Sequence, residues 1–175
     1  GRAAFAQSWR QRRIPGAGPI GRLAGSGERV VALSDGKLYL SRDRGDTWEE
    51  ISGQSGVRDL ETFRGDFYAI SQFQTGYEYN LELRRSEDGL TWDSVWIVRD
   101  IANYSEIGLR PLSLATDGLG DVIEQGLRLN VIAHYSHPWN KGTLHLSSVD
   151  GITWQDTGSF DANLNKMGNY WRPLN

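Results

Sequence analysis

Ser86-Glu87-Asp88-Gly89-Leu90-Thr91-Trp92 is the stretch that decides the fold, because two further stretches of the chain repeat its pattern. The pattern is S-x-D-G-x-T-W, with one extra residue before the glycine in the first copy. A unit that recurs along a chain indicates a repeat architecture, in which every copy builds one structural unit. The other two copies are Ser41-Arg42-Asp43-Arg44-Gly45-Asp46-Thr47-Trp48 and Ser148-Val149-Asp150-Gly151-Ile152-Thr153-Trp154.

Each copy has the chemistry of a tight turn followed by a strand. Glycine supplies the positive φ that such a turn needs, and serine and aspartate side chains bond N–H groups across it. Threonine and tryptophan then begin an outer strand, where the indole can bury a large area. We therefore assign structural roles to Ser41, Asp43, Gly45, Thr47, Trp48, Ser86, Asp88, Gly89, Thr91, Trp92, Ser148, Asp150, Gly151, Thr153 and Trp154.

Short alternating strands precede each copy, as in Leu38-Tyr39-Leu40, where the apolar residues recur with period two. In every unit we predict a strand beginning near an arginine, a second apolar strand and a third that ends in the signature, and after the first two signatures a fourth strand at the edge. The predicted strands are 22–24, 29–33, 37–41 and 49–52, then 60–63, 67–73, 81–85 and 94–98, then 112–116, 129–135 and 143–147.

The signature resembles the Asp-box, or BNR repeat, of sialidase-like β-propellers, and the resemblance covers most of the chain. It implies an all-β fold of four-stranded antiparallel blades, with about three complete blades and partial blades at both ends. In that family the Asp-box lies at the periphery of the blade, away from the axial ligand site. The resemblance therefore predicts the fold and does not place an active site in the boxes.

The whole chain, 1–175, is predicted to be one β-propeller segment. Residues 1–16 are expected to be an outer strand of a preceding blade, 17–53 blade one, 54–100 blade two, 101–160 blade three with insertions, and 161–175 the start of a further blade. Propellers close with about four to eight blades, so three units do not close a ring. Either the chain is part of a longer propeller, or copies associate to complete one, or the end strands pair into a minimal fourth blade.

The third unit is the elaborated one. The signature tryptophans Trp48, Trp92 and Trp154 stand 44 and 62 residues apart, which leaves about eighteen extra residues in unit three. We assign them to 100–109 and 117–127 and expect inserted loops there, where binding residues concentrate.

Four arginines recur at the starts of the predicted innermost strands: Arg22, Arg58, Arg110 and Arg172. Innermost strands line the axial channel of a propeller, so these side chains could form a cationic ring for carboxylate, sulfate or phosphate. Sialidases are similar in holding a sugar carboxylate with three axial arginines. The alternative is that the arginines pair with neighbours such as Asp59 or Glu61, or lie on the outside.

The resemblance also implies what a catalytic member would need: a tyrosine nucleophile activated by a glutamate, and an aspartate acid. Tyr104 and Glu106 are the candidates for the pair, and no motif identifies the acid. Arg13-Ile14-Pro15 looks like part of a sialidase motif, but it follows a decayed box at Ser8-Trp9 and is expected far from the axis.

His134-Tyr135-Ser136-His137-Pro138-Trp139 is the most distinctive segment outside the repeats, and we expect it in a loop between the second and third strands of unit three. Its exposed aromatic and hydrogen-bonding residues suit contact with a sugar or a protein, which makes His134, Tyr135, His137 and Trp139 ligand candidates. On a strand His134 and His137 would lie on opposite faces, and no third ligand is evident, so no metal site is predicted. Tyr77 and Tyr79 are weaker candidates of the same kind.

Composition excludes several classes of function. The net charge of −3 and pI near 5.6 give no overall attraction to nucleic acid, and no apolar run approaches the 18 or so residues that span a bilayer. The absence of cysteine excludes disulfides and thiolate metal sites. We expect no nucleic-acid partner, no membrane span, no cofactor and almost no helix.

These observations predict a non-catalytic binding or adhesion module that recognises a carbohydrate or a protein partner through the loops of unit three and the axial arginines. The first alternative is part of a sialidase-like glycoside hydrolase. The second is a structural propeller within a larger assembly. Family resemblance implies an extracytoplasmic, surface or virion-associated location.

Overall fold

The computed structural model describes residues 13–76, 78–100, 103–116, 122–137 and 140–156, and within these ranges it contains strands and turns but no helix. Its twelve strands form three four-stranded antiparallel sheets. The predicted all-β class and the four-stranded antiparallel units are therefore confirmed.

Each sheet is built from four strands that follow one another in the chain and pair in that same order. Sheet 1 contains β1 (Ile20–Ser26), β2 (Arg29–Ser34), β3 (Lys37–Ser41) and β4 (Glu49–Glu50). Sheet 2 contains β5 (Val57–Phe63), β6 (Asp66–Thr75), β7 (Glu78–Ser86) and β8 (Asp93–Asp100). Sheet 3 contains β9 (Asn103–Thr116), β10 (Val122–His137), β11 (Asn140–Ser148) and β12 (Gln155–Asp156).

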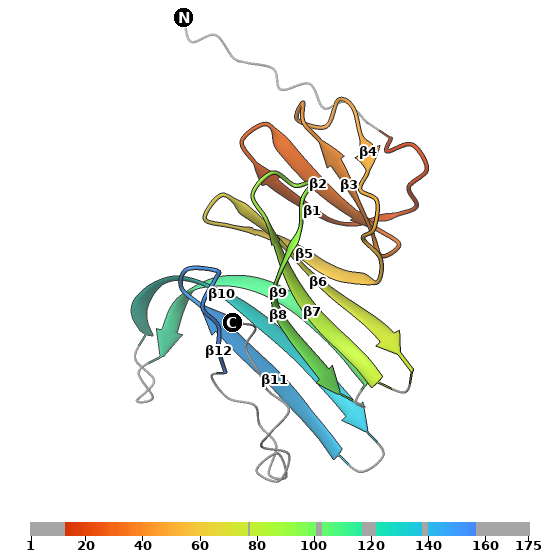
Figure 1. Cartoon of the computed structure of the whole chain (residues 1–175). Coiled ribbons are helices and arrows are strands. Elements are labelled where there is room, and N and C mark those ends of the chain that lie inside the picture. The colour runs from red at the N-terminus through yellow and green to blue at the C-terminus, as the bar shows by residue number, and fades with distance from the viewer. Residues whose placement is uncertain (1–12, 77, 101–102, 117–121, 138–139, 157–175) are drawn as a thin grey trace, which may run out of the picture.

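The three sheets follow one another face to face in chain order, with sheet 2 between the other two (Figure 1). The first strand of each sheet lies near the first strand of the next, so β1 contacts β5 and β5 contacts β9. Local chemistry sets the hairpins: Asp35 and Gly36 both have positive φ, 49° and 75°, as the two central residues of a type I′ turn require.

The core consists of two apolar clusters, one on each side of sheet 2. Between sheets 1 and 2 lie Ala24, Val31, Leu33, Leu38, Leu40, Ile51, Val57, Leu60, Phe67 and Ala69. Between sheets 2 and 3 lie Phe63, Tyr68, Ile70, Leu81, Leu83, Trp96, Leu129, Val131, Leu144 and Leu146. Strand β6 alternates between them, with Phe67 and Ala69 on one side and Tyr68 and Ile70 on the other. Its unbroken apolar run follows from burial on both faces.

The inserted stretches of the third unit differ from the expectation of loops. Residues 103–109 lie within β9 and 122–127 within β10, which makes these strands 14 and 16 residues long. The reason is that the two strands pair along most of their length, from Tyr135 with Tyr104 to Val122 with Thr116. Pairing satisfies backbone groups that a loop would leave to water.

The segment that begins at His134 was also expected in a loop, and this prediction was wrong for its first four residues. His134–His137 complete β10, and β11 begins at Asn140. Residues 138–139 lie outside the described residues, as do the first twelve residues and 157–175, which hold Ser8-Trp9 and Arg172. Residues 13–16, expected to belong to an outer strand, form a turn without a strand.

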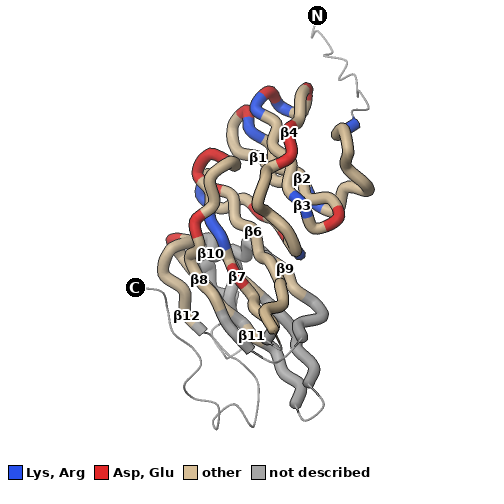
Figure 2. Tube along the Cα trace, turned by 45° about the vertical axis from the view of Figure 1, so that its right-hand side comes forward, with Lys and Arg blue, Asp and Glu red and all other residues tan. Residues whose placement is uncertain are grey.

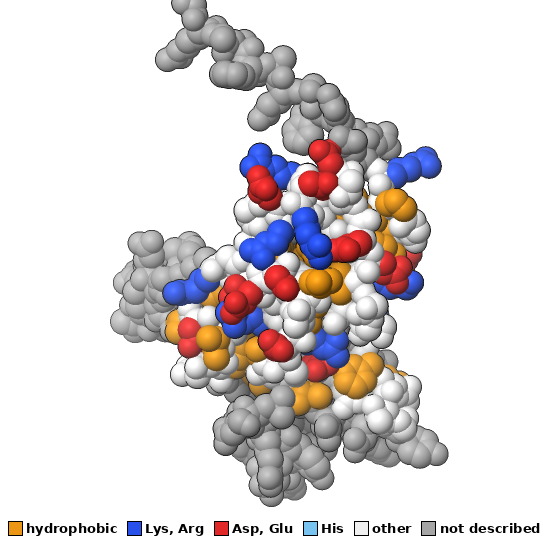
Figure 3. Space-filling model, turned by 45° about the horizontal axis from the view of Figure 1, so that its top comes forward, with side chains coloured by type: hydrophobic (Ala, Val, Ile, Leu, Met, Phe, Trp, Pro, Cys, Tyr) orange, Lys and Arg blue, Asp and Glu red, His pale blue; other side chains and the backbone are white. Residues whose placement is uncertain are grey.

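Charge is mixed over the described surface. Lysine or arginine and aspartate or glutamate alternate along the tube of sheet 1 in Figure 2, and blue and red groups lie side by side on the face seen in Figure 3. Ion pairs such as Arg42 with Glu49 and Arg44 with Glu28 account for part of this mixture. Among the described residues, no helix is long and apolar enough to cross a membrane.

Candidate functional site

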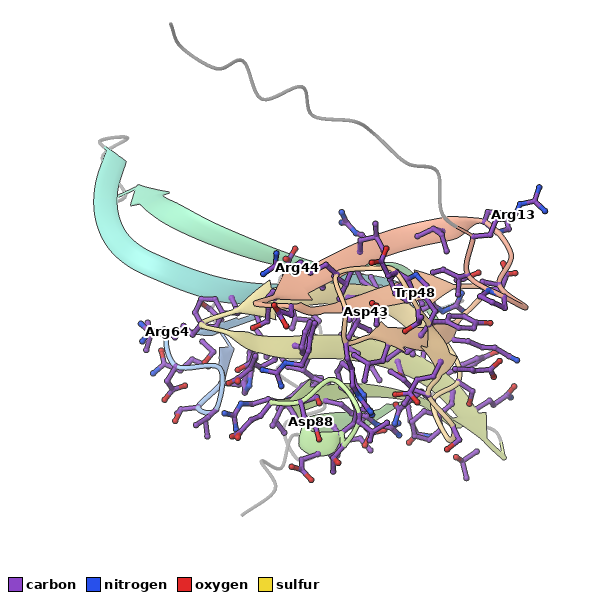
Figure 4. The ribbon with its side chains drawn as sticks, turned by 90° about the horizontal axis from the view of Figure 1, so that it is seen from above. Arg13, Asp43, Arg44, Trp48, Arg64 and Asp88 are labelled. Carbon is purple, nitrogen blue, oxygen red and sulfur yellow. The ribbon has the colours of Figure 1, made fainter. Side chains whose placement is uncertain are left out.

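The three signature stretches form three equivalent turns, here called turn 1 (residues 41–48), turn 2 (86–92) and turn 3 (148–154). In turn 3 the Ser148 hydroxyl donates to Asp150 Oδ1 at 2.9 Å and accepts the Gly151 N–H at 2.7 Å, while the Thr153 N–H donates to the same Asp150 oxygen at 2.7 Å. The same three bonds occur in turn 2 and in turn 1. Figure 4 shows Asp43 and Trp48 in turn 1 and Asp88 in turn 2.

These bonds stabilise the ionised form of each turn aspartate. Donation from the side chain and then the N–H of Thr47, together with the Ser41 hydroxyl, lowers the pKa of Asp43 from 3.8 to about 2. The N–H groups of Thr91 and Leu90 lower the pKa of Asp88, and those of Thr153 and Ile152 lower the pKa of Asp150. A carboxylate held ionised by backbone donors cannot serve as a general acid near neutral pH. The turns therefore suit a structural role.

The signature tryptophans close the turns. Trp48 Nε1 donates to the Gly45 carbonyl at 3.0 Å, and Trp92 Nε1 donates to the Gly89 carbonyl at 3.2 Å. Trp154 differs, because its Nε1 is buried without a hydrogen-bond partner in the described part of the chain. Its ring instead packs edge-on against Tyr68 of sheet 2, with ring centroids 6.5 Å apart. The third tryptophan thus contributes to the contact between sheets.

The glycines of turns 2 and 3 pack on the preceding sheet. A Cβ added at Gly89 would lie 2.9 Å from a methyl of Leu40 and 3.2 Å from one of Val31, both in sheet 1. A Cβ added at Gly151 would overlap the hydroxyl of Tyr68 in sheet 2. Turn 1 has no such neighbour among the described residues, since a Cβ at Gly45 would meet only Trp48 of its own turn. Turns 2 and 3 therefore fasten adjacent sheets as well as strands.

The four candidate arginines are not equivalent. Arg22 of β1 donates from Nε to Asp59 Oδ1 of β5 at 2.8 Å, and this pairing raises the pKa of Arg22. Asp59 is almost fully buried and also accepts the N–H of Leu60. Arg58 is exposed at the irregularity between Val57 and Asp59. Arg22 therefore forms an ion pair between sheets 1 and 2. Pairing with a neighbour is the alternative to a cationic ring that the sequence analysis raised for the four arginines.

Only the backbone of Arg110 is described, and Arg172 lies outside the described residues. Arg110 pairs in register with Asn130 of β10. A ring of four axial arginines thus stays a prediction. Arg13 is described and exposed, and Figure 4 shows it well apart from turns 1 and 2.

We expect the Arg22–Asp59 pair to contribute measurably to stability, because removing Arg22 would leave a buried carboxylate with one donor fewer. Arg22 is about 40% exposed, so water screens part of the loss and the expected cost of Arg22→Gln is about 1–2 kcal/mol. Urea unfolding of Arg22→Gln, Asp59→Asn and the double variant checks it. Additive costs, with no coupling energy between the two sites, would contradict a direct interaction.

Strand pairing in sheet 3 places several of the candidate residues from the sequence analysis directly opposite other residues. Glu106 is the partner of His134, Tyr104 the partner of Tyr135, and Asn140 the partner of His137. A shift in register between His134 and Tyr135 leaves one residue of β9 unpaired, and it assigns Tyr104 and Glu106 to opposite faces of the sheet. Trp139 and Tyr77 lie outside the described residues, and Tyr79 belongs to β7 and not to a loop.

Among the side chains that the structure describes, no three His, Cys, Asp or Glu residues lie close enough together to hold a metal ion. At the position three residues before the turn serine, the third unit carries His145, where the other two units carry Leu38 and Leu83.

Comparison with known proteins leaves the family open. No protein-family model matches this chain. No curated protein matches it with significant similarity.

Proposed function

We propose that this chain is a segment of a sialidase-like β-propeller that serves as a non-catalytic binding module for carbohydrate. The propeller part is supported by three features: units of four antiparallel strands in chain order, first strands that lie side by side, and one turn signature with one hydrogen-bonding pattern after each third strand. Stacked meander sheets whose first strands adjoin are the arrangement of propeller blades.

The observation that carries the binding proposal is the pairing of Tyr104 with Tyr135 near the end of sheet 3. Residues directly opposite each other on antiparallel strands share a face of the sheet. Two tyrosine positions are thereby brought together, and the next pair on the same face joins His137 to Asn140. An aromatic platform flanked by hydrogen-bonding residues suits a sugar, whose C–H face stacks on the ring while its hydroxyls bond the polar groups.

A glycan array probed with the full chain tests this proposal. We expect Tyr104→Ala and Tyr135→Ala each to weaken binding of the retained glycan about two- to tenfold, the value of one aromatic contact. Leu90→Ala is the matched control, since Leu90 is also an exposed large side chain but belongs to turn 2. Equal weakening by Leu90→Ala, or no effect of either tyrosine variant, would contradict the proposal.

Arg110→Ala tests the cationic ring in the same array. Selective loss of acidic glycans would support a role of Arg110 in binding a sugar carboxylate or sulfate. Unchanged binding of acidic glycans would remove the ring and leave the tyrosine positions as the site.

The catalytic alternative is less well supported, because the register assigns Tyr104 and Glu106 to opposite faces of sheet 3. A nucleophile and the base that activates it must come within hydrogen-bond reach. Hydrolysis of an aryl sialoside by the wild-type chain, abolished by Tyr104→Phe, would reverse this preference. Absence of any bound glycan would instead favour a protein partner or a structural role in a larger assembly.

A further inference from the structure

Strand register defines the face on which each sheet receives the preceding sheet. In sheet 2, Phe67 lies in the cluster between sheets 1 and 2, and its partner on β7 is the turn residue Ser86. In sheet 1, Val30 pairs in the same way with the turn residue Ser41 and so occupies the equivalent position. We call this side of a sheet its rear face. The rear face of sheet 1 lies at one end of the described stack, and no described sheet packs on it (Figure 1).

The rear face of sheet 1 exposes a leucine where that of sheet 2 buries one. Leu23 of β1 pairs with Ala32, and at the equivalent position Leu60 of β5 pairs with Ala69. Leu60 lies in the cluster between sheets 1 and 2 and is 1% exposed, whereas Leu23 is 61% exposed. The difference follows from the presence of sheet 1 against Leu60.

The start of the first strand repeats this difference. Ile20 pairs with Ser34, and Val57 pairs with Ser71, in both sheets just before an irregularity of register. Val57 is 3% exposed within the same cluster, whereas Ile20 is 43% exposed. Two large apolar side chains of β1 are thus exposed at positions where β5 packs against a neighbouring sheet.

The segment before sheet 1 matches the connection between sheets 1 and 2. Residues 14–20 and 51–57 both begin with isoleucine, and both have a glycine of positive φ, 76° and 75°, as their third residue. Ile51 is buried in the cluster between sheets 1 and 2, and its N–H donates to the Leu38 carbonyl of β3. Ile14, its equivalent, is partly exposed. The chain therefore enters sheet 1 as it enters sheet 2, where a preceding sheet is present.

The connecting segments cover only the β3 side of the rear face. The Tyr39 hydroxyl donates to the Gly16 carbonyl at 3.4 Å, and at the equivalent position of sheet 2 the Arg84 guanidinium donates to Gln54 Oε1 at 2.6 Å. Tyr39 is accordingly buried. What remains uncovered in sheet 1 is the β1 side, which in sheet 2 is the side that contacts the sheet before it.

Turn 1 agrees with this difference between the sheets. A Cβ added at Gly89 or Gly151 would meet side chains of the preceding sheet, but one at Gly45 would meet only Trp48 of its own turn. The strand, the connecting segment and the turn of sheet 1 thus all have the form of a contact between sheets. An apolar surface of this kind marks a site of interaction.

We propose that the rear face of sheet 1 binds sheet 3 of a second copy of this chain, and that two copies close head to tail into a ring of six sheets. Neither 1–12 nor 157–175 has the length of the shortest sheet, sheet 1, which spans 20–50. One copy offers both contact partners, since sheets 1 and 3 lie at the two ends of the described stack (Figure 1).

The closure of the ring follows from the kind of contact. A contact between two different faces either closes into a ring or continues as a filament. Six sheets fall within the range of about four to eight blades with which propellers close. This inference rests on the propeller part of the proposed function and is separate from its carbohydrate part.

Sedimentation velocity of the full chain at several concentrations tests the contact. We expect a species of twice the 19.6 kDa of one chain. Leu23→Glu should weaken the dimer by at least about tenfold, because it would bury a carboxylate in an apolar contact. Leu90→Glu is the matched control and should dimerise like the wild type, since Leu90 is also an exposed leucine but belongs to turn 2 of the middle sheet. Circular dichroism establishes that both variants retain their strands.

Three results would overturn the proposal: a monomer at every concentration, equal weakening by Leu90→Glu, or species larger than a dimer. If Leu23→Glu fails to fold, hydrogen exchange of the wild-type chain decides, because it requires no substitution. The N–H groups of β1 should become more protected as the concentration rises, and unchanged protection would exclude the contact. A monomer that binds glycan would overturn only the ring, and a dimer that binds none would overturn only the carbohydrate binding.

Discussion

Gly151→Ala is expected to destabilise the fold by about 3 kcal/mol or more. Two costs add at this residue. Its φ is +79°, a left-handed conformation that costs an L-residue about 1–2 kcal/mol. The new methyl would also overlap the hydroxyl of Tyr68, a rigid and fully buried side chain that packs between Phe63 and Trp154. Overpacking of this kind costs about 1–3 kcal/mol.

The same substitution in the other turns separates the two costs. Gly45→Ala has the same backbone strain, with φ +96°, but its nearest neighbour would be Trp48 at an ordinary 3.5 Å. Gly89→Ala should fall between them, because the methyl would lie 2.9 Å from Leu40 and 3.2 Å from Val31, closer than any contact at Gly45 but without the overlap at Gly151. The expected order of destabilisation is Gly151→Ala, then Gly89→Ala, then Gly45→Ala, with about 1–2 kcal/mol for the last.

Denaturant unfolding of the three variants measures this order. Equal costs in all three turns would mean that only backbone conformation matters and that the turns do not fasten neighbouring sheets. A smaller change at Gly151 than at Gly45 would contradict the contact with Tyr68.

Acid is expected to weaken the fold between about pH 4 and pH 2, through the three turn aspartates. Each has a folded-state pKa below its ordinary value of 3.8, and that of Asp43 is about 2. A lowered folded pKa means that the stabilisation is fully present above the unfolded pKa and is lost as pH falls through the folded pKa. Because Asp43, Asp88 and Asp150 are exposed, water moderates the size of each contribution.

The triple variant Asp43→Asn, Asp88→Asn and Asp150→Asn isolates this effect. It should melt below the wild type at pH 7, and the difference should shrink as the pH falls below 4 and through about 2, the folded-state pKa of Asp43. Thermal melts followed by circular dichroism at several pH values give both curves. Parallel curves for the two proteins would show that the acid sensitivity comes from other groups.

Much of the fold could be predicted from the repeat. Strand 37–41 was predicted with the bounds that β3 has, because Leu38 and Leu40 alternate with Tyr39 between two strong turn signals. The structural reading of the turn residues agrees with their hydrogen bonds, since serine, aspartate and glycine at this spacing act on their own backbone. Strand ends were less predictable: β9 and β10 extend through stretches whose only local signal was extra length.

The candidate sites, unlike the fold, could mostly not be predicted from the sequence. The sequence identified His134 and Glu106 as separate candidates but gave no reason to connect them. Register connects them, because a cross-strand neighbour depends on which residues the hairpins bring opposite one another. Likewise Asp59 was one example of a neighbour with which the four arginines could pair, and the approach of β1 to β5 pairs it with Arg22.

The sequence by itself determined the units of this protein: four antiparallel strands and a serine, aspartate and glycine turn, repeated three times. These features depend on residues within a few positions of each other, so local conformation and alternation are enough to specify them. Tertiary structure decided which units meet and through which atoms, including Gly151 against Tyr68, Arg22 with Asp59, and Glu106 opposite His134. Such contacts depend on the stacking of sheets and on strand register, which no local pattern contains.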